Sequence, residues 1–346
     1  MTTHVDDLKL AGNQAEVDKL IASLEKRFDK LKLEKGNFEH CGIVHAQDPQ
    51  DFSIAMHQNH YIAQLRPMAD DECRRMAPDA LVDQATHAVY MSLLGGVAWL
   101  IQTRPDVACY VSALQRRLQA PRAKDVIALN RVLKYLKRKP LVIRYRKISC
   151  AMRLAVISDS AFQSQDQDCL AMRSGIIALV GHLGAGEFEV QPIEWLCKKQ
   201  QHVCRSTYAA ELHSALDLVG LGLLINQCMN EVIKGPVDAA TLCEWHEQGL
   251  YALKLDLYID ARAVFDSVCA RHVKTPADKA LLVHALKLRE YLDRQQVQTV
   301  SWIDTRDMVA DALNKGTIER EAVREFFSVG KWHVKHAIKS WQFGQT

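Results

Sequence analysis

Four acidic residues in the second half of the chain stand where their carboxylates could meet at one point. Asp159 ends the run RLAVISD and Asp260 ends YALKLDLYID, and both runs are rich in residues that form buried strands. Glu211 lies near the start of a predicted helix, for which Ser206 and Thr207 are N-cap candidates and which runs to about Met229. Asp311 lies near the start of a short helix. Carboxylates suit Mg²⁺ or Mn²⁺, because these ions prefer hard oxygen ligands. The pattern therefore predicts a two-metal nuclease.

Isolated Asp and Glu residues are more often solvated surface groups than metal ligands, so the segments around the four acids must carry the argument. These segments are SDSAF (158–162), IEWLCKKQ (193–200), STYAAEL (206–212), YIDARAVFD (258–266) and ADALNKG (310–316). In this order they resemble the RNase H domain of copia-type retrotransposon polyproteins. In that family the first, third, fourth and fifth segments carry the metal-binding acids, and all four acids are present here.

The resemblance implies an endoribonuclease that cuts the RNA strand of RNA/DNA hybrids with two Mg²⁺ or Mn²⁺ ions. Asp159 and Asp260 would bind and bridge the ions, while Glu211 and Asp311 would each complete the shell of one ion. The implied fold is α/β (α+β), with an RNase H-like mixed five-stranded sheet and flanking helices. Four carboxylates repel one another, so the site is expected to be more stable with metal.

The first half of the chain also resembles this family. THVDDLKLAG (3–12) resembles the end of a reverse transcriptase palm, where a hairpin presents two aspartates, here Asp6 and Asp7. A polymerase needs a third carboxylate and a nucleotide pocket upstream of this hairpin, and the sequence contains neither. We therefore interpret Asp6 and Asp7 as a polymerase remnant and expect no polymerase activity from this chain alone.

Residues that end helices and strands, together with the family resemblance, predict four segments. These are a partial reverse transcriptase palm (1–66), a helical thumb and connection (67–148), an RNase H-like domain (149–320) and a C-terminal tail (321–346). An amphipathic helix is predicted over 14–33, helices over 84–102 and 105–118, and a strand over 141–147 that leads towards the nuclease domain. The resemblance extends over roughly residues 3–335.

A basic stretch lies between residues 116 and 147, where Asp125 is the only acid. Apolar residues at helical spacing place Arg131, Lys134 and Arg138 on a solvated face. Such a run is often only a solvated face, but before a hybrid-cleaving domain we interpret it as a surface that holds phosphates. The predicted nucleic-acid contacts are Arg116, Arg117, Arg131, Lys134, Lys137 and Arg138.

Several positions depart from the family pattern. Ala261 replaces an asparagine after the third acid, and Ala280 replaces a histidine. Three histidines, His202, His213 and His284, suggest a general acid, although a single histidine on a helix is more often a packing or surface residue.

The composition agrees with an intracellular protein, cytoplasmic or nuclear. The net charge is only +3, and the ten cysteines show no CxxC pair or zinc-ligand spacing. No apolar run reaches the length expected for a membrane span, and no signal-peptide core is evident, so no membrane partner is predicted.

Three functional hypotheses remain open. The first is an active ribonuclease H derived from a retrotransposon polyprotein. The second is a catalytically inactive remnant that still binds nucleic acid, which predicts hybrid binding without divalent ions. The third is a structural partner of a complete reverse transcriptase, which predicts a heterodimer without turnover of its own. Retention of all four acids favours the first.

Overall fold

The computed structural model describes residues 2–4, 7–162 and 170–344. Its largest element is a mixed seven-stranded sheet with the strand order β12-β9-β8-β7-β10-β11-β13. The strands are β7 (Met152–Ala161), β8 (Leu170–Gly184), β9 (Glu187–Val203), β10 (Leu255–Ile259), β11 (Thr299–Ile303), β12 (Lys331–His333) and β13 (Ile338–Gln342). Among the described strands of this sheet, β10 pairs in parallel with β7 on one side and with β11 on the other, and the remaining neighbours pair antiparallel.

The mixed α/β architecture predicted from the sequence is confirmed, but the predicted number of five strands in this sheet is wrong. The two additional strands, β12 and β13, come from residues 331–342, which were predicted to form a tail. Helix α12 (Glu321–Ser328) precedes them and buries Phe326 and Phe327 completely. The C-terminal residues therefore complete the sheet and its core.

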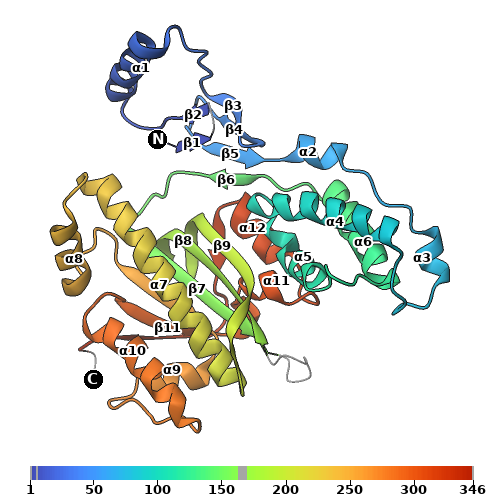
Figure 1. Cartoon of the computed structure of the whole chain (residues 1–346). Coiled ribbons are helices and arrows are strands. Elements are labelled where there is room, and N and C mark those ends of the chain that lie inside the picture. The colour runs from blue at the N-terminus through green and yellow to red at the C-terminus, as the bar shows by residue number, and fades with distance from the viewer. Residues whose placement is uncertain (1, 5–6, 163–169, 345–346) are drawn as a thin grey trace.

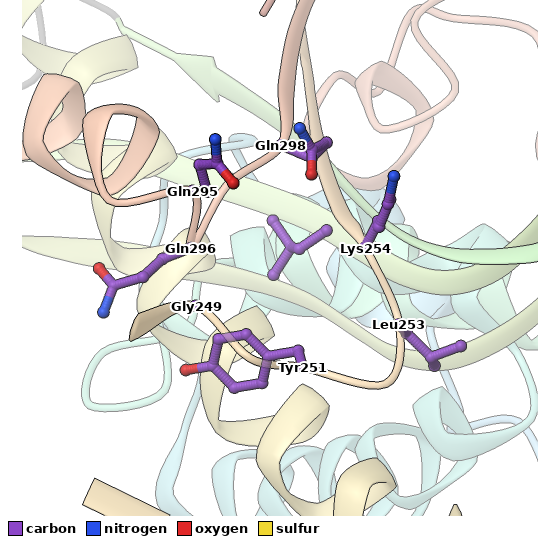
Figure 2. A pocket seen from close by; sticks show the side chains of 8 residues that line it. Gly249, Tyr251, Leu253, Lys254, Gln295, Gln296 and Gln298 are labelled. Atoms are coloured by element: carbon purple, nitrogen blue, oxygen red, sulfur yellow. The ribbon is translucent and has the colours of Figure 1, made fainter. Parts of the chain in front are cut away.

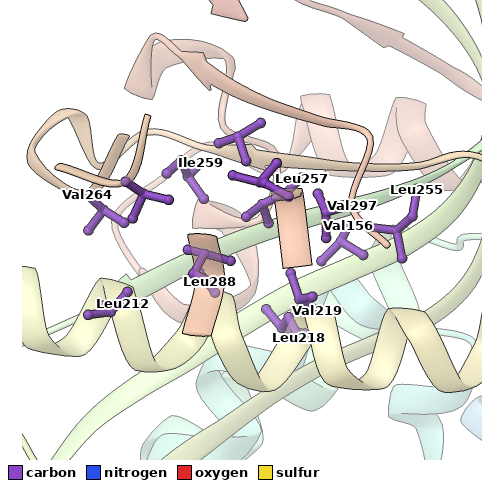
Figure 3. Close-up of a cluster of buried hydrophobic side chains, with 14 of the residues drawn as sticks. Val156, Leu212, Leu218, Val219, Leu255, Leu257, Ile259, Val264, Leu288 and Val297 are labelled. Atoms are coloured by element: carbon purple, nitrogen blue, oxygen red, sulfur yellow. The ribbon is translucent and has the colours of Figure 1, made fainter. Parts of the chain in front are cut away.

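Helices cover both faces of the sheet (Figure 1). On one face, α7 (Thr207–Lys234) lies along β7 and β10 together with α9 (Arg262–Val268) and α10 (Leu282–Asp293). Figure 3 shows how Leu218 and Val219 of α7 face Val156 of β7 and Leu257 of β10. The opposite face is covered by α11 (Asp311–Asn314), α12 and part of α5 (Ala108–Gln115).

Helix α7 begins as the sequence predicts and ends later. The hydroxyl of Ser206 caps it by accepting a hydrogen bond from the Ala209 amide at 3.2 Å. The helix continues to Lys234, where Gly235 adopts a positive φ of 91°. One 18-residue window of α7 is apolar enough to span a membrane by length and composition, so the expectation of no such run was wrong; 56% of that window is buried, as in a core helix.

A smaller antiparallel sheet has the order β3-β4-β5-β6. Its strands are β3 (Asn37–His40), β4 (Ile43–Gln47), β5 (Ile54–His57) and β6 (Ile143–Tyr145). The strand predicted over 141–147 thus begins at Ile143 and pairs with β5 instead of leading directly into the large sheet. Near the N-terminus, β1 (Thr2–His4) pairs only with β2 (Asp7–Lys9) among the described strands, and α1 (Gln14–Phe28) buries no residue.

The remaining helices form a layer with its own apolar core. They are α2 (Asn59–Gln64), α3 (Asp71–Arg75), α4 (Gln84–Trp99) and α6 (Ala123–Arg138), with the 3₁₀ turns η1 (Leu100–Gln102) and η2 (Pro105–Val107). Elsewhere the chain forms α8 (Ala239–Gln248) and the turns η3 (Lys279–Leu281) and η4 (Thr305–Asp307). The predicted helices 84–102 and 105–118 each consist of an α-helix and a 3₁₀ turn. The two 3₁₀ turns lie on either side of Thr103 and Arg104, because Pro105 cannot continue the preceding helix.

A buried ionic network joins this helical layer to the large sheet. Arg104 is fully buried and donates two hydrogen bonds of 2.8 Å to the carboxylate of Asp106. Tyr135 of α6 and Arg324 of α12 donate to the same carboxylate at 2.9 and 3.1 Å. Because each charge is paired, the network can be buried between α6 and α12 and can hold the two regions together.

Candidate metal centre

Strand pairing explains why two of the acids meet. Ile259 of β10 pairs with Ser158 of β7 in parallel register, so the next residues, Asp260 and Asp159, emerge side by side at the same edge. Asp311 reaches this edge from the first turn of α11, where the Ser174 hydroxyl of β8 donates to the Ala310 carbonyl at 3.0 Å. The three aspartates thus come from adjacent strands and a helix anchored on the sheet.

Three of the four predicted acids form one compact cluster. Oxygens of Asp159, Asp260 and Asp311 all lie within 4.8 Å of one another. Asp159 is fully buried, Asp311 is 3% exposed and Asp260 is partly buried. Such a concentration of carboxylates in a protein interior requires a compensating positive charge, because like charges at this spacing repel strongly.

The fourth acid, Glu211, lies beside the cluster on the second turn of α7. Its Oε2 atom is buried and has no hydrogen-bond partner among the residues that the structure describes. Helix α7 is fixed to β7 at this level, because the Ser214 hydroxyl donates to the Asp159 carbonyl at 2.9 Å. An unpaired buried carboxyl oxygen is costly, because its hydrogen-bonding capacity is not satisfied inside the protein.

The pKa values of Asp311, Asp260 and Glu211 are shifted upward. Burial raises the pKa of Asp311 to about 8, with a further contribution from Asp159. Burial and then Asp159 raise the pKa of Asp260, and burial followed by Asp159 and Asp260 raises the pKa of Glu211 well above its ordinary value. The carboxylates therefore bind protons tightly when no metal is present, which is the expected behaviour of crowded buried acids.

Two residues that the sequence analysis did not single out contact the cluster. The Lys315 ammonium donates to Asp311 at 2.5 Å and to Asp159 at 3.3 Å, and the Asn314 amide donates to Asp159 at 2.7 Å. Burial opposes the charge on Lys315, but Asp159 and Asp311 raise its pKa above the ordinary value. The i, i+4 spacing of Asp311 and Lys315 in a short helix was the available signal for this contact.

The loop after Lys315 is held by helix α5. Tyr110 donates its hydroxyl hydrogen to the Gly316 carbonyl at 2.8 Å, and Arg320 donates to the Lys315 carbonyl at 2.9 Å. The Arg320 guanidinium also lies over the Tyr110 ring, 5.0 Å from its centroid. Helix α5 therefore contributes directly to the position of the loop that follows Lys315.

The donor set fits a hard divalent ion. Four carboxylates converge at one edge of the sheet, and the Oε2 atom of Glu211 lacks a partner among the described residues. Mg²⁺ and Mn²⁺ prefer such oxygen ligands, whereas no sulfur or imidazole ligand belongs to the cluster found in the described part of the chain. The cluster could be a metal site.

The N-terminal aspartates are separate from this cluster. Asp7 is the first residue of β2 and is exposed, while Asp6 lies outside the described residues. The cluster of metal-ligating side chains found in the described residues does not include Asp7.

The predicted nucleic-acid contacts lie on the surface. Arg116 and Arg117 follow α5, and four residues, Arg131, Lys134, Lys137 and Arg138, are exposed along α6. Lys137 donates to the Leu65 carbonyl at 2.6 Å, and Arg117 lies 3.8 Å from Asp125. Lys137 and Arg117 therefore have contacts within the protein as well as an exposed side chain.

The three histidines singled out in the sequence come together. His202 stacks on His213, and the edge of one ring of the pair His213 and His284 meets the face of the other. Burial lowers the pKa of His213, and the charges of His284 and His202 lower it further.

A cavity of about 300 Å³ lies at the opposite end of β10 (Figure 2). It is lined by Gly249, Tyr251, Leu253, Lys254, Leu255, Gln295, Gln296 and Gln298. Leu255 begins β10 and Asp260 follows its end, so the cavity and the acids are separated by the length of the strand, about 16 Å at 3.3 Å per residue. This cavity is not part of the acid cluster.

Sequence comparison relates the chain to retrotransposon polyproteins. The chain is 24% identical over 347 aligned positions to the retrovirus-related Pol polyprotein from transposon RE1 of Arabidopsis thaliana, covering 95% of this chain. It is 25% identical over 345 positions to the polyprotein from transposon RE2 of the same plant, covering 94%. The chain is thus distantly homologous, over most of its length, to copia-type retrotransposon Pol polyproteins.

The chain spans about a fifth of the length of these relatives, since it covers 21% of each. An uncharacterized mitochondrial protein of A. thaliana is 25% identical over 219 residues, which are 60% of this chain and 86% of that protein. No model of a known protein family matches the sequence.

Proposed function

We propose that this chain is a ribonuclease H that cuts the RNA strand of RNA/DNA hybrids. The observation that carries the proposal is the meeting of Asp159, Asp260 and Asp311 within 4.8 Å, beside the unpaired Oε2 of Glu211. The homology to Pol polyproteins supports a nucleic-acid substrate. Polymerase activity is not part of the proposal.

The topology of the sheet supports this assignment. Its five inner strands have the order β9-β8-β7-β10-β11, with antiparallel pairing up to β7 and parallel pairing beyond it. A mixed sheet with helices on both faces agrees with the RNase H-like fold that the sequence resemblance implies. A fold alone does not assign an activity, so the acid cluster carries the proposal of hydrolysis.

The proposed roles of the acids follow from their positions. Asp159 and Asp260 would hold both Mg²⁺ or Mn²⁺ ions, and Glu211 and Asp311 would each hold one. Two bound ions supply an activated water and stabilise the departing 3′ oxygen of the cleaved strand. Without metal, the Lys315 ammonium would balance the negative charge of Asp311 and Asp159. It would have to move away from both carboxylates before they could bind an ion.

A second cavity offers a place for the phosphates of the substrate next to the acids. It has a volume of about 330 Å³, and Asp311 borders it. Its charged lining is mixed, with the cations Arg306, Lys331 and Lys335 beside the acids Asp307, Glu319 and Glu325. Exposed cations attract the nucleic-acid backbone without reading its sequence. The basic face of α6 would bind a more distant part of the hybrid. We further propose that the protein acts in the cytoplasm or nucleus, where such hybrids occur.

One observation favours a second role as the structural partner of a complete reverse transcriptase. Helix α1 has an apolar side but no buried residue, with Phe28 63% exposed. A larger polymerase could cover this helix. This role predicts a stable heterodimer, with no turnover by this chain alone.

The test of the nuclease is cleavage of a labelled RNA/DNA hybrid by purified protein in Mg²⁺ and in Mn²⁺. The Asp260→Asn variant removes one cluster carboxylate, and Glu247→Gln removes an exposed carboxylate as the matched control. We expect RNA-strand cleavage that requires metal, is lost in Asp260→Asn and is retained in Glu247→Gln. Cleavage that persists in Asp260→Asn, or its absence in the folded wild-type protein, would reject the proposal.

A further inference from the structure

Three histidine side chains from separate parts of the chain meet at one point. His202 lies near the end of β9, His213 on the second turn of α7 and His284 on the first turn of α10. The ring centroids of His202 and His213 are 5.1 Å apart, and those of His213 and His284 are 4.6 Å apart. His213 is therefore the centre of the cluster, with one imidazole on either side.

One polar atom of these rings is buried without a hydrogen-bond partner among the described residues. No ring nitrogen of the three forms a hydrogen bond with another residue that the structure describes, and the Nδ1 atom of His284 is fully buried without a partner. His213 is only 9% exposed. A neutral imidazole carries one donor and one acceptor, and leaving the buried Nδ1 atom of His284 unpaired destabilises the fold. Packing alone gives no reason to gather three such rings.

We propose that His202, His213 and His284 form a binding site for a transition-metal ion such as Zn²⁺. Neutral imidazole is the common nitrogen ligand of Zn²⁺, with Zn–N distances of about 2.0–2.1 Å. Two imidazoles on one tetrahedral ion at these distances have ring centres roughly 5 Å apart. The two measured separations already match that spacing.

One rearrangement completes the site. His202 stacks on His213 with an interplanar angle of 26°, so its nitrogens do not yet point at a shared centre with the other two rings. Among the described residues, only the three aspartates already bring ligand atoms of three side chains within 4.8 Å of one another. The His202 side chain is exposed and its ring nitrogens form no hydrogen bond with a described residue, so the side chain can rotate at little cost.

The histidine site differs in chemistry from the acid cluster. Imidazole favours Zn²⁺, Ni²⁺ and Cu²⁺, whereas carboxylates favour Mg²⁺ and Mn²⁺. The histidine site would cross-link α10 to the neighbouring elements β9 and α7, which precede it in sequence by about 50 residues or more. The ion would thus act on the stability of the fold, and the proposal does not rest on the proposed nuclease activity.

The test uses the full chain with Asp260→Asn as background, to weaken divalent binding at the acids. Zn²⁺ binding is measured by calorimetry and Co²⁺ binding by visible absorption, since tetrahedral nitrogen-ligated Co²⁺ absorbs far more strongly than octahedral Co²⁺ held by carboxylates and water. The variants are His202→Gln, whose side chain is exposed, and His284→Gln. The matched control is His272→Gln, which changes an exposed histidine outside the cluster.

We expect one Zn²⁺ equivalent and a tetrahedral Co²⁺ spectrum in the background protein and in His272→Gln. Each cluster variant should lower the Zn²⁺ affinity by about tenfold or more and abolish the Co²⁺ spectrum. Zn²⁺ should also raise the midpoint of thermal unfolding in the background protein and not in His202→Gln. The proposal is overturned if the background protein binds no Zn²⁺, or if His202→Gln, folded by circular dichroism, binds Zn²⁺ and Co²⁺ unchanged.

Discussion

The large sheet and the N-terminal region are built in opposite ways. Strand β10 is buried along its whole length, and helix α7 buries twelve residues against the sheet. In the N-terminal region, α1 buries no residue and β4 buries only Ile43 and His45. Both regions contain amphipathic patterns in their sequences, but only the large sheet pairs each pattern with a partner surface. The acid cluster lies in the large sheet, where the surrounding strands and helices are packed against one another and hold the side chains in place.

The largest expected effect comes from the junction between the helical layer and the sheet. Arg104→Met removes the main partner of the buried Asp106 carboxylate and should lower the free energy of unfolding by about 3–5 kcal/mol. Urea denaturation measures it, with the exposed Arg75→Met as a control expected to change little. If both variants behaved alike, the junction would not couple the two regions.

The contrast in packing itself can be measured with one pair of leucines. Leu218→Ala creates a cavity in the core between α7 and the sheet and should cost about 2–5 kcal/mol of unfolding free energy. Leu20→Ala changes a leucine of α1 that is 36% exposed and should stay within about 0.5 kcal/mol. A comparable cost for Leu20→Ala in the purified chain would show that α1 is covered, for example by a second copy.

The pH dependence of stability should reveal the crowded acids. The pKa of Asp311 is raised to about 8, so the folded state binds this proton more tightly than the unfolded chain. Its contribution to stability is therefore fully present below the unfolded pKa near 3.8 and is lost as the pH rises through about 8. We expect the metal-free wild-type protein to lose stability relative to Asp311→Asn between pH 5 and 8. Equal pH profiles for the two proteins would contradict the shift.

Lys315 should compete with divalent ions for the same carboxylates. Lys315→Met removes the ammonium that contacts Asp311 and Asp159, and should tighten Mn²⁺ binding by about tenfold, or 1.4 kcal/mol. The same change should destabilise the metal-free protein, because the acids lose their counter-charge. Mn²⁺ titration followed by electron paramagnetic resonance tests this, and weaker Mn²⁺ binding would instead make Lys315 a residue that supports the metal.

The smallest effect is expected at the basic surface. Arg131 and Lys134 are exposed on α6, and replacing each by Gln should weaken hybrid binding a few-fold without changing stability. The salt dependence of binding should also become shallower, by about one unit in slope for each lost phosphate contact. Fluorescence anisotropy in Ca²⁺, at two or more salt concentrations, measures both quantities. An unchanged slope would leave α6 as a solvated face.

The sequence was informative where local patterns decide the structure. The apolar runs before Asp159 and Asp260 predicted two strands, and parallel register then brings their ends together. The cap at Ser206 located the start of α7. The mixed α/β class followed from these elements.

Contacts between distant parts of the chain could not be inferred in this way. Nothing local in residues 331–342 indicates that they pair with β9 and β11, since both strands are short and depend on tertiary partners. The meeting of His202, His213 and His284 likewise depends on three elements whose packing is decided by the whole core. Asn314 and Lys315 lay inside a segment already noted for Asp311, and only geometry identified their contacts.

The Asp106 network has a consequence for how genes encoding such proteins can be rearranged. Asp106 accepts hydrogen bonds from Arg104, Tyr135 and Arg324, so residues on both sides of the short link between β6 and β7 share one buried charge. A recombination breakpoint in that link would combine Asp106 from one gene with the residue at position 324 from another gene. Breakpoints before α2 avoid this network, so the helical layer and the large sheet are expected to be inherited together while the N-terminal region is exchanged more freely.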